Sequence, residues 1–151
     1  MKHNLLLLAH LAAVAAWLGA NLVQFVVAPR FRRAGGAIAQ QWTDTAAFLG
    51  RRYYNVVGIL VAVTGVLLVL DGEWHWQGFV IVGIAMVVVG GVTGVAILEP
   101  LLKRETAARE AGDTATVART QHNFNAVATL DTLLVLLTML AMIDRWHGGV
   151  G

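Results

Sequence analysis

Four long apolar segments constrain this 151-residue chain more than any other feature of its sequence. They lie at about 5–27, 53–70, 76–98 and 124–143. Each is close to the ~20 residues that a helix needs to cross the hydrocarbon core of a bilayer. A content of 58% hydrophobic and only 13% charged residues is unlike that of a soluble domain. The sequence therefore predicts an all-α polytopic membrane protein, a single four-transmembrane-helix bundle covering residues 1–151.

The basic residues are divided unequally between the two sides of this predicted bundle. Of the 11 Lys and Arg residues, all but Lys2 and Arg145 lie in the loops 28–52 and 99–123. Because cytoplasmic loops carry an excess of Lys and Arg, we expect both long loops in the cytoplasm and both termini outside, in the cell (inner or plasma) membrane. Tyr53 and Tyr54 are then expected at the inner membrane interface. No basic stripe with interleaved aromatics is present, so we expect no nucleic-acid partner.

Both long loops show helical patterns. Apolar residues recur at helical spacing after the Gly35–Gly36 pair, which predicts a short helix lying on the inner membrane surface (Ile38, Trp42, Ala46, Leu49). In the second loop, the residues that follow Pro100 predict a helical extension of the third segment. Gly112 and Asp113 are expected to end that extension.

His10 is the single ionisable residue of the first apolar segment. On a helical wheel, its side of the helix also carries Ala13, Trp17, Asn21 and Gln24. Lipid cannot satisfy such a polar stripe, so the stripe must face other helices, a cofactor or a wet cavity. An ionisable residue inside a membrane is by default a functional-site hypothesis.

The chain contains no cysteine, so any metal or haem must be held by His, Met or carboxylate side chains. Helix direction places His10 about two turns below the outer surface, at a depth similar to that of Met139 and Met142 in the fourth segment. Imidazole together with thioether suits haem iron or copper. We expect His10 to be a ligand or a proton carrier, with a simple hydrogen bond to a neighbouring helix as the alternative.

Asp131 is the second polar anomaly, some two turns into the fourth segment and at the depth of Asn21 and Gln24. An ionised Asp costs roughly 2.5–3.5 kcal/mol at midspan, so this carboxyl is either protonated or partnered. One interpretation is a hydrogen bond from the first to the fourth segment that only specifies packing. The other is a carboxyl that handles protons or contacts a substrate.

Glycine spacing points to close helix packing in the third segment. Gly90 and Gly94 form a GxxxG pair, and Gly83 lies on the same face. Small residues allow membrane helices to approach closely. The motif predicts contact within one subunit, with a homo-oligomer or another membrane-complex partner as the alternative.

The run AHLAAVAAWLG at 9–19 carries a family resemblance, since its histidine is followed seven residues later by Trp and then Gly. It resembles the first span of HemJ-type protoporphyrinogen oxidases, of the CopD copper-resistance membrane domain and of uncharacterised four-span relatives. Further similarity lies in the Arg51–Arg52 pair, the aromatic outer loop and the TLL run at 132–134, while VVAPRF at 26–31 is closer to the uncharacterised relatives. The resemblance implies that His10 corresponds to the family histidine proposed to ligate haem.

The candidate cofactor-binding residues are thus His10, Trp17 and Met142, with His10 as the metal ligand and haem b or copper as the cofactor. HemJ proteins carry a lysine early in the third span that is thought to be needed for activity, whereas this chain has no lysine between Lys2 and Lys103. Whether the chain is an enzyme therefore stays open. Two functions remain: an intramembrane haem, porphyrin or copper site, with redox chemistry as one option, or a non-catalytic subunit or scaffold of a larger membrane complex.

Overall fold

The computed structural model of the chain describes the backbone of residues 1–72 and 77–147 and the side chains of 1–72 and 77–144. Within these ranges every element is a helix, which confirms the all-α prediction for the described part. The α-helices are α1 (Lys2–Ala34), α2 (Gly36–Phe48), α3 (Asn55–Asp71), α4 (Gly78–Thr93), α5 (Glu99–Glu110) and α6 (Thr114–His147). Two π-helical segments, η1 (Leu49–Tyr54) and η2 (Gly94–Leu98), join α2 to α3 and α4 to α5.

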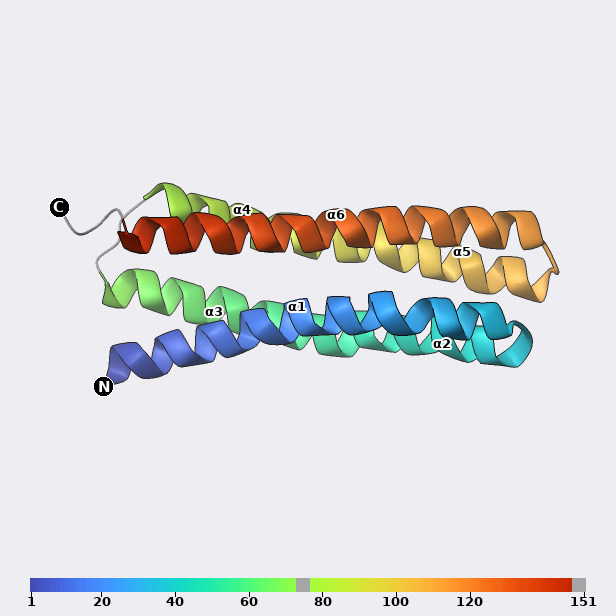
Figure 1. Cartoon of the computed structure of the whole chain (residues 1–151), viewed down its shortest axis with the longest axis horizontal. Coiled ribbons are helices and arrows are strands. Elements are labelled where there is room, and N and C mark those ends of the chain that lie inside the picture. The colour runs from blue at the N-terminus through green and yellow to red at the C-terminus, as the bar shows by residue number, and fades with distance from the viewer. Residues whose placement is uncertain (73–76, 148–151) are drawn as a thin grey trace.

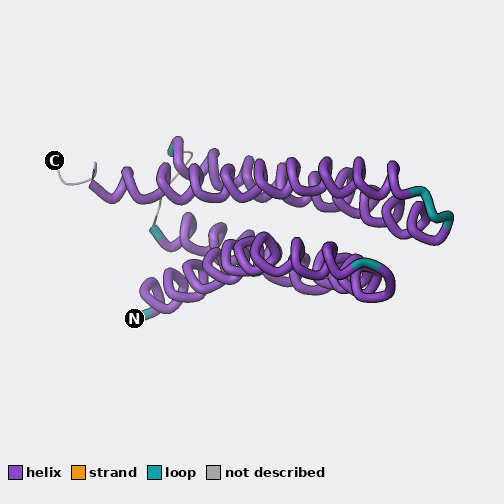
Figure 2. The backbone as a smooth tube through the Cα atoms, turned by 45° about the vertical axis from the view of Figure 1, so that its right-hand side comes forward, coloured by secondary structure: helices purple, strands orange, loops and turns teal. Residues whose placement is uncertain are grey.

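These elements form four rods. The elements α2, η1 and α3 make one continuous helix, as do α4, η2 and α5. In the first hairpin α1 packs along the α2–η1–α3 rod, and in the second α6 packs along the α4–η2–α5 rod (Figure 1). The two hairpins lie side by side, with the start of α1 and the end of α6 at one end, here called the terminal end (Figure 2). The α1–α2 and α5–α6 turns lie at the opposite end, here called the basic end.

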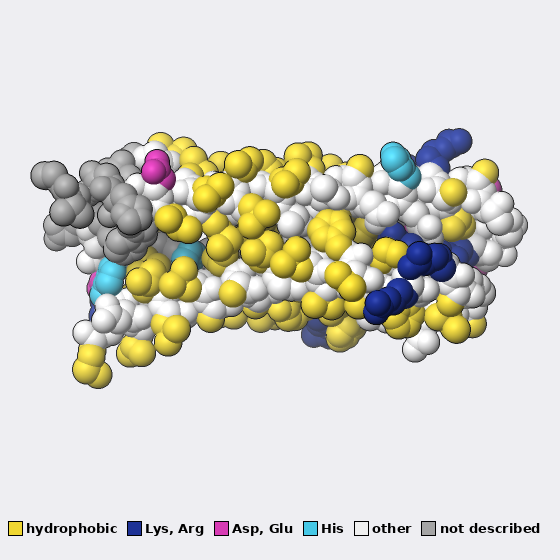
Figure 3. Space-filling model, in the orientation of Figure 1, with side chains coloured by type: hydrophobic (Ala, Val, Ile, Leu, Met, Phe, Trp, Pro, Cys, Tyr) yellow, Lys and Arg dark blue, Asp and Glu magenta, His cyan; other side chains and the backbone are white. Residues whose placement is uncertain are grey.

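All four rods are long and apolar enough to cross a membrane. With a rise of 1.5 Å per residue, the 33 residues of α1 make a helix about 50 Å long, which exceeds the ~30 Å of a hydrocarbon core. On the face drawn in Figure 3, many hydrophobic side chains lie along the middle, and Lys and Arg gather toward the basic end. The rods therefore extend beyond the predicted apolar segments mainly at the basic end.

The prediction of a surface helix after Gly36 is wrong. Instead, α2 runs back along α1 in line with the bundle (Figure 1). Trp42 is buried and stacks on Phe31 of α1, with ring centroids 5.3 Å apart. Of the apolar residues that suggested a membrane-surface helix, Trp42 and Ala46 are buried against the rest of the bundle, whereas Ile38 is exposed. An amphipathic pattern alone does not distinguish these two surroundings.

The expected helix breaks are confirmed at both turns of the basic end. Gly35, Gly36 and Gly112 have φ values of 69°, 50° and 71°, a left-handed region that side chains with a Cβ avoid. After Gly112, the Asp113 carboxylate accepts a hydrogen bond from the Thr116 backbone N–H at 3.0 Å and so caps the start of α6. Hydrogen bonding from Thr116 lowers the pKa of Asp113 because it favours the charged carboxylate. The predicted extension of the third segment is confirmed as α5.

Candidate functional site

His10 lies on α1 and packs against α3. Only 8% of the residue is exposed, and its Nδ1 is 2.9 Å from the hydroxyl oxygen of Thr64. Gly65 leaves room for the ring, because a Cβ at that position would lie 3.3 Å from the imidazole Cε1. The prediction that His10 faces the helices rather than lipid is confirmed.

The Thr64 hydroxyl determines which nitrogen of His10 carries the proton. Its Oγ1 lies 2.5 Å from the backbone carbonyl oxygen of Leu60, and two oxygens this close share a hydrogen, so the hydroxyl proton is donated to the carbonyl. Oγ1 then accepts from His10, which assigns the proton to Nδ1 in the neutral ring. Nε2 therefore keeps its lone pair and is the nitrogen that can bind a metal or accept a proton.

Trp17 lies where the two hairpins meet. Its indole ring fills the space beside two glycines, lying 3.4 Å from the position of a Cβ on Gly58 of α3 and 3.2 Å from that of a Cβ on Gly90 of α4. Its Nε1 donates to Oδ2 of Asp131 on α6 at 3.4 Å. One side chain of α1 thus contacts the other three rods.

Asn21 adds a second link between α1 and α6. Its side-chain nitrogen donates to Asp131 Oδ2 at 3.2 Å and to Thr132 Oγ1 at 3.0 Å. Its carbonyl oxygen accepts a hydrogen bond from the Tyr54 hydroxyl at 2.6 Å. Both N–H groups and the oxygen of this amide are therefore engaged. The predicted hydrogen bond from the first to the fourth apolar segment is confirmed for Asn21.

Gln24 has a different partner from the one expected by depth. Its side-chain nitrogen donates to the Tyr54 hydroxyl at 2.6 Å rather than to Asp131. Tyr54 and Tyr53 belong to η1, and the Tyr53 hydroxyl donates to the backbone carbonyl of Ala16 at 3.0 Å. Both tyrosine hydroxyls therefore bond to α1, and their expected place at the inner membrane interface stays a prediction. The mid-bundle network, as named here, consists of Trp17, Asn21, Gln24, Tyr54, Asp131 and Thr132.

Met142 and the glycines of the third segment have separate neighbours. The terminal methyl of Met142 lies 2.7 Å from the position of a Cβ on Gly83, so Met142 packs on α4 while His10 packs on α3. The structure therefore does not place these two predicted ligands against a shared neighbour. Gly90 faces Trp17, whereas the space beside Gly94 is open within this chain. Within this chain, Gly90 and Gly94 therefore do not form one continuous packing face.

Metal-binding side chains do not form a cluster within the described ranges. Within them, no three His, Cys, Asp or Glu side chains are placed to hold a metal ion together. A groove of about 490 Å³ lies at the basic end between α2, η1 and α5. It is lined by mixed charges (Asp44, Arg51, Glu99, Lys103 and Glu110). His10, Trp17 and Met142 do not line this groove.

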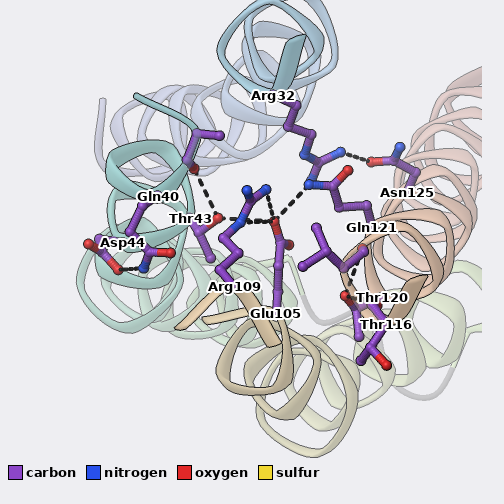
Figure 4. Close-up of polar contacts among 12 residues, drawn as sticks. Arg32, Gln40, Thr43, Asp44, Glu105, Arg109, Thr116, Thr120, Gln121 and Asn125 are labelled. Carbon is purple, nitrogen blue, oxygen red and sulfur yellow. Dashed lines mark hydrogen bonds and ion pairs between the residues drawn. The ribbon is translucent and has the colours of Figure 1, made fainter. Parts of the chain in front are cut away.

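A second polar cluster, at the basic end, was not predicted. Glu105 of α5 is only 1% exposed, and its Oε1 accepts hydrogen bonds from Thr43 at 3.1 Å and Gln121 at 2.8 Å. Arg109 forms a salt bridge to the same oxygen at 2.7 Å (Figure 4). Because Thr43 lies on α2 and Gln121 on α6, this Glu105 cluster joins the two hairpins.

Arg32 of α1 reinforces the joint at the basic end. Its guanidinium donates to the Asn125 side-chain oxygen at 2.7 Å and lies 5.8 Å from the centre of the Phe124 ring. Its Nε is buried without a hydrogen-bond partner. In Figure 4, Arg32 reaches from α1 toward α6 beside the Glu105 cluster. Two polar contacts therefore cross between the hairpins at this end.

Some of the missed residues carry a signal in the sequence. Glu105 shares a helical face with Leu101 and Ala108, both of them buried, so its position predicts a buried carboxylate. Thr64 is the single hydroxyl-bearing side chain between Asn55 and Asp71. Its isolation in an apolar segment is the same kind of signal that singled out His10.

Comparison of the chain with protein-family models, with curated proteins and with solved structures gives no match. The resemblance to the HemJ and CopD families therefore depends on the motif residues alone. The site offers two chemically active groups: one oriented imidazole between α1 and α3, and one carboxyl held by neutral donors between α1 and α6.

Proposed function

We propose that this chain is a multi-pass protein of the inner or plasma membrane, with the basic end in the cytoplasm, whose His10 binds haem b through Nε2. The observation that carries the proposal is the hydrogen bond between Nδ1 of His10 and Thr64. Haem-binding histidines present one nitrogen to iron while the other donates to a neighbouring acceptor. Thr64 supplies that acceptor, because its own proton is donated to Leu60.

The donor set favours haem over copper. Haem iron already has four ring nitrogens, so one axial imidazole from the protein is sufficient to hold it. Copper depends on several protein ligands, and the softest candidate, Met142, packs on Gly83 of α4. His10 as a single oriented ligand therefore fits haem better.

The roles of the chain's own residues follow from their contacts. Thr64 fixes the tautomer and the ring orientation of His10, and Gly65 provides the space in which the ring lies. Burial of His10 keeps lipid away from the imidazole. Haem bound at this position would supply one-electron redox chemistry within the membrane.

The visible spectrum of the purified protein tests this proposal. After expression with added haem and purification in detergent, we expect a Soret band that is lost in His10→Ala and restored when free imidazole is added to that variant. His122→Ala is the matched control, because His122 is exposed on α6 at the basic end. A colourless, metal-free protein after supplementation with haem and with copper would contradict the proposal.

The scaffold function is favoured by a different observation. In the mid-bundle network, the Asn21 amide uses all of its hydrogen-bonding groups on partners within the chain. Polar groups satisfied in this way specify how membrane helices associate and require no ligand. A protein with this function would present its two joined hairpins to another membrane subunit.

Mutations separate the two functions. A scaffold loses its partner complex in Asn21→Leu, because the hairpin contact is weakened, and retains the complex in His10→Ala. If the protein binds haem at His10, the Soret band is lost in His10→Ala and retained in Asn21→Leu. Co-purification from detergent extracts, scored beside the Soret absorbance of the same samples, provides both readouts.

A further inference from the structure

Asp131 is a carboxyl group whose bonded partners are neutral. Its Oδ2 accepts from the indole N–H of Trp17 at 3.4 Å and from the amide N–H of Asn21 at 3.2 Å. No Lys, Arg or His is bonded to it within residues 1–72 and 77–144. Acidic residues inside a membrane are normally compensated by a partner of opposite charge, or else they serve proton transfer.

The groups that face Asp131 come from every rod of the bundle. From α1 come Trp17 and Asn21, and from α4 comes Gly90, which has no side chain. On α6 itself the neighbour is Thr132, whose hydroxyl donates to the backbone at 2.8 Å. From the α2–η1–α3 rod, Tyr54 is the titratable group of the network; its hydroxyl bonds to Asn21, and it also interacts electrostatically with Asp131.

The two carboxyl oxygens have different surroundings. Both donors bond Oδ2, whereas Oδ1 faces Gly90 and lies 3.7 Å from the position that a Cβ would take there. Gly90 contributes only a hydrogen there, beside the Trp17 ring, and no donor of the described residues is bonded to Oδ1. Oδ1 is therefore the oxygen at which a proton can arrive and leave without breaking the contacts to α1.

We propose that Asp131 is an exchangeable proton-binding site inside the membrane, with the proton on Oδ1. On proton uptake one O–H bond forms at Oδ1 and the negative charge of the carboxylate disappears, which removes the cost of a charge in hydrocarbon. The proposal stands independently of haem binding at His10. It rests on the neutral donor set and on an Oδ1 to which no donor of the described residues is bonded.

The protonation state of Asp131 affects the strength of the contact between the hairpins. Hydrogen bonds to an ionised acceptor are roughly twice as strong as those between neutral groups. The bonds from Trp17 and Asn21 are therefore stronger when Asp131 is ionised and weaker when it is neutral. A proton bound at this site changes how firmly α1 holds α6.

Infrared difference spectroscopy of the full-length protein in liposomes tests the proposal. Spectra recorded between about pH 4 and about pH 9 are expected to contain the C=O stretch of a protonated carboxyl, which shifts in D₂O. We expect Asp131→Asn to lack this band and Asp44→Asn to retain it. Asp44 is a suitable control because it is exposed on α2 and bonded to Gln40.

Two further variants keep the proposal falsifiable if Asp131→Asn does not fold. Asp131→Glu retains a carboxyl and is expected to move the band, and Trp17→Phe removes one donor from Oδ2 and is expected to shift the pH midpoint of the band. The proposal is overturned if the native protein and Asp131→Asn give the same spectra at every pH. It is equally overturned if Trp17→Phe leaves the midpoint unchanged, since the Oδ2 contacts would then have no bearing on the proton.

Discussion

The two carboxyls that join the hairpins, Glu105 and Asp131, are compensated in different ways. Glu105 is almost fully buried at the basic end and pairs with Arg109 one turn along the same helix. Asp131 lies in the apolar middle and is held by an indole and an amide, both neutral. The same chemical group thus forms an ion pair at one level of the bundle. At the other level it makes a contact whose charge can change.

The position along the rods explains this difference. Arg109 lies in α5, beyond the predicted apolar segments, and its side chain is partly exposed. Trp17 and Asn21 lie inside the first apolar segment, where a lysine or arginine would need its own compensation. A chain that places a lone acid at midspan therefore uses neutral donors to orient it.

Glu105→Gln is expected to give the largest loss of stability. Removal of one partner from a buried ion pair leaves the other charge uncompensated, at a cost of about 3–5 kcal/mol. Asp131→Asn should cost about 1 kcal/mol or less, because the amide oxygen still accepts from Trp17 and Asn21 and no buried cation is left behind. Unfolding of the detergent-solubilised variants, followed by circular dichroism, measures both changes.

Two controls sharpen this contrast between the carboxyls. Glu110→Gln lies on the same helix as Glu105 but is exposed, so it should change stability little. The double variant Glu105→Leu/Arg109→Leu should recover much of the loss, because both charges are removed together. Equal losses of stability in Glu105→Gln and Asp131→Asn would contradict this contrast, because the ion pair with Arg109 would then make no difference to the stability of the bundle.

The sequence predicts the mid-bundle region better than the basic end. His10, Asn21 and Asp131 stand out because a polar group inside an apolar segment must find a partner, and the number of helices is small. Glu105 does not stand out, since a glutamate beside an arginine is normally a solvated pair on a helix surface. Its burial follows from α2 folding back along α1, which the spacing after Gly36 did not distinguish from a membrane-surface helix.

The π-helical segments also lie outside what the sequence predicts. In η1 the wider turn accompanies two tyrosines whose hydroxyls both bond to α1, and η2 begins at Gly94, the second glycine of the GxxxG pair. Such turns are set by tertiary contacts rather than by local propensity. From its depth along the first segment, Gln24 is expected near Asp131. In the structure it bonds to the Tyr54 hydroxyl of η1 instead.

Glycine substitutions test the packing of the mid-bundle region. A Cβ at Gly90 would lie 3.2 Å from the Trp17 ring, so Gly90→Ala should cost about 1–3 kcal/mol through overpacking. Gly94→Ala should have little effect within one subunit, because nothing lies within 4 Å of that position. Thermal unfolding of the two variants in the same detergent compares them.

An oligomer contact would reverse this order. If Gly94→Ala lowered stability as much as Gly90→Ala, the open side of η2 would be covered by a second chain. Size-exclusion chromatography of the Gly94→Ala protein would then show a smaller species than the native protein. An unchanged elution volume together with a destabilised Gly90→Ala variant supports packing within the subunit.

The smallest expected effect is the coupling between Asn21 and Asp131. Measured couplings between polar side chains of membrane helices average about 0.6 kcal/mol and reach about 1.7 kcal/mol, because the unfolded state in a membrane also finds partners. A double-mutant cycle of Asn21→Leu and Asp131→Leu should fall in this range, whereas the same cycle with His10→Ala in place of Asn21→Leu should be near zero. His10 bonds to Thr64 within the first hairpin, so it has no direct share in the contact to α6. A coupling near zero for Asn21 as well would mean that the hairpins are held together at the Glu105 cluster, with the mid-bundle carboxyl free to change its charge without moving α1.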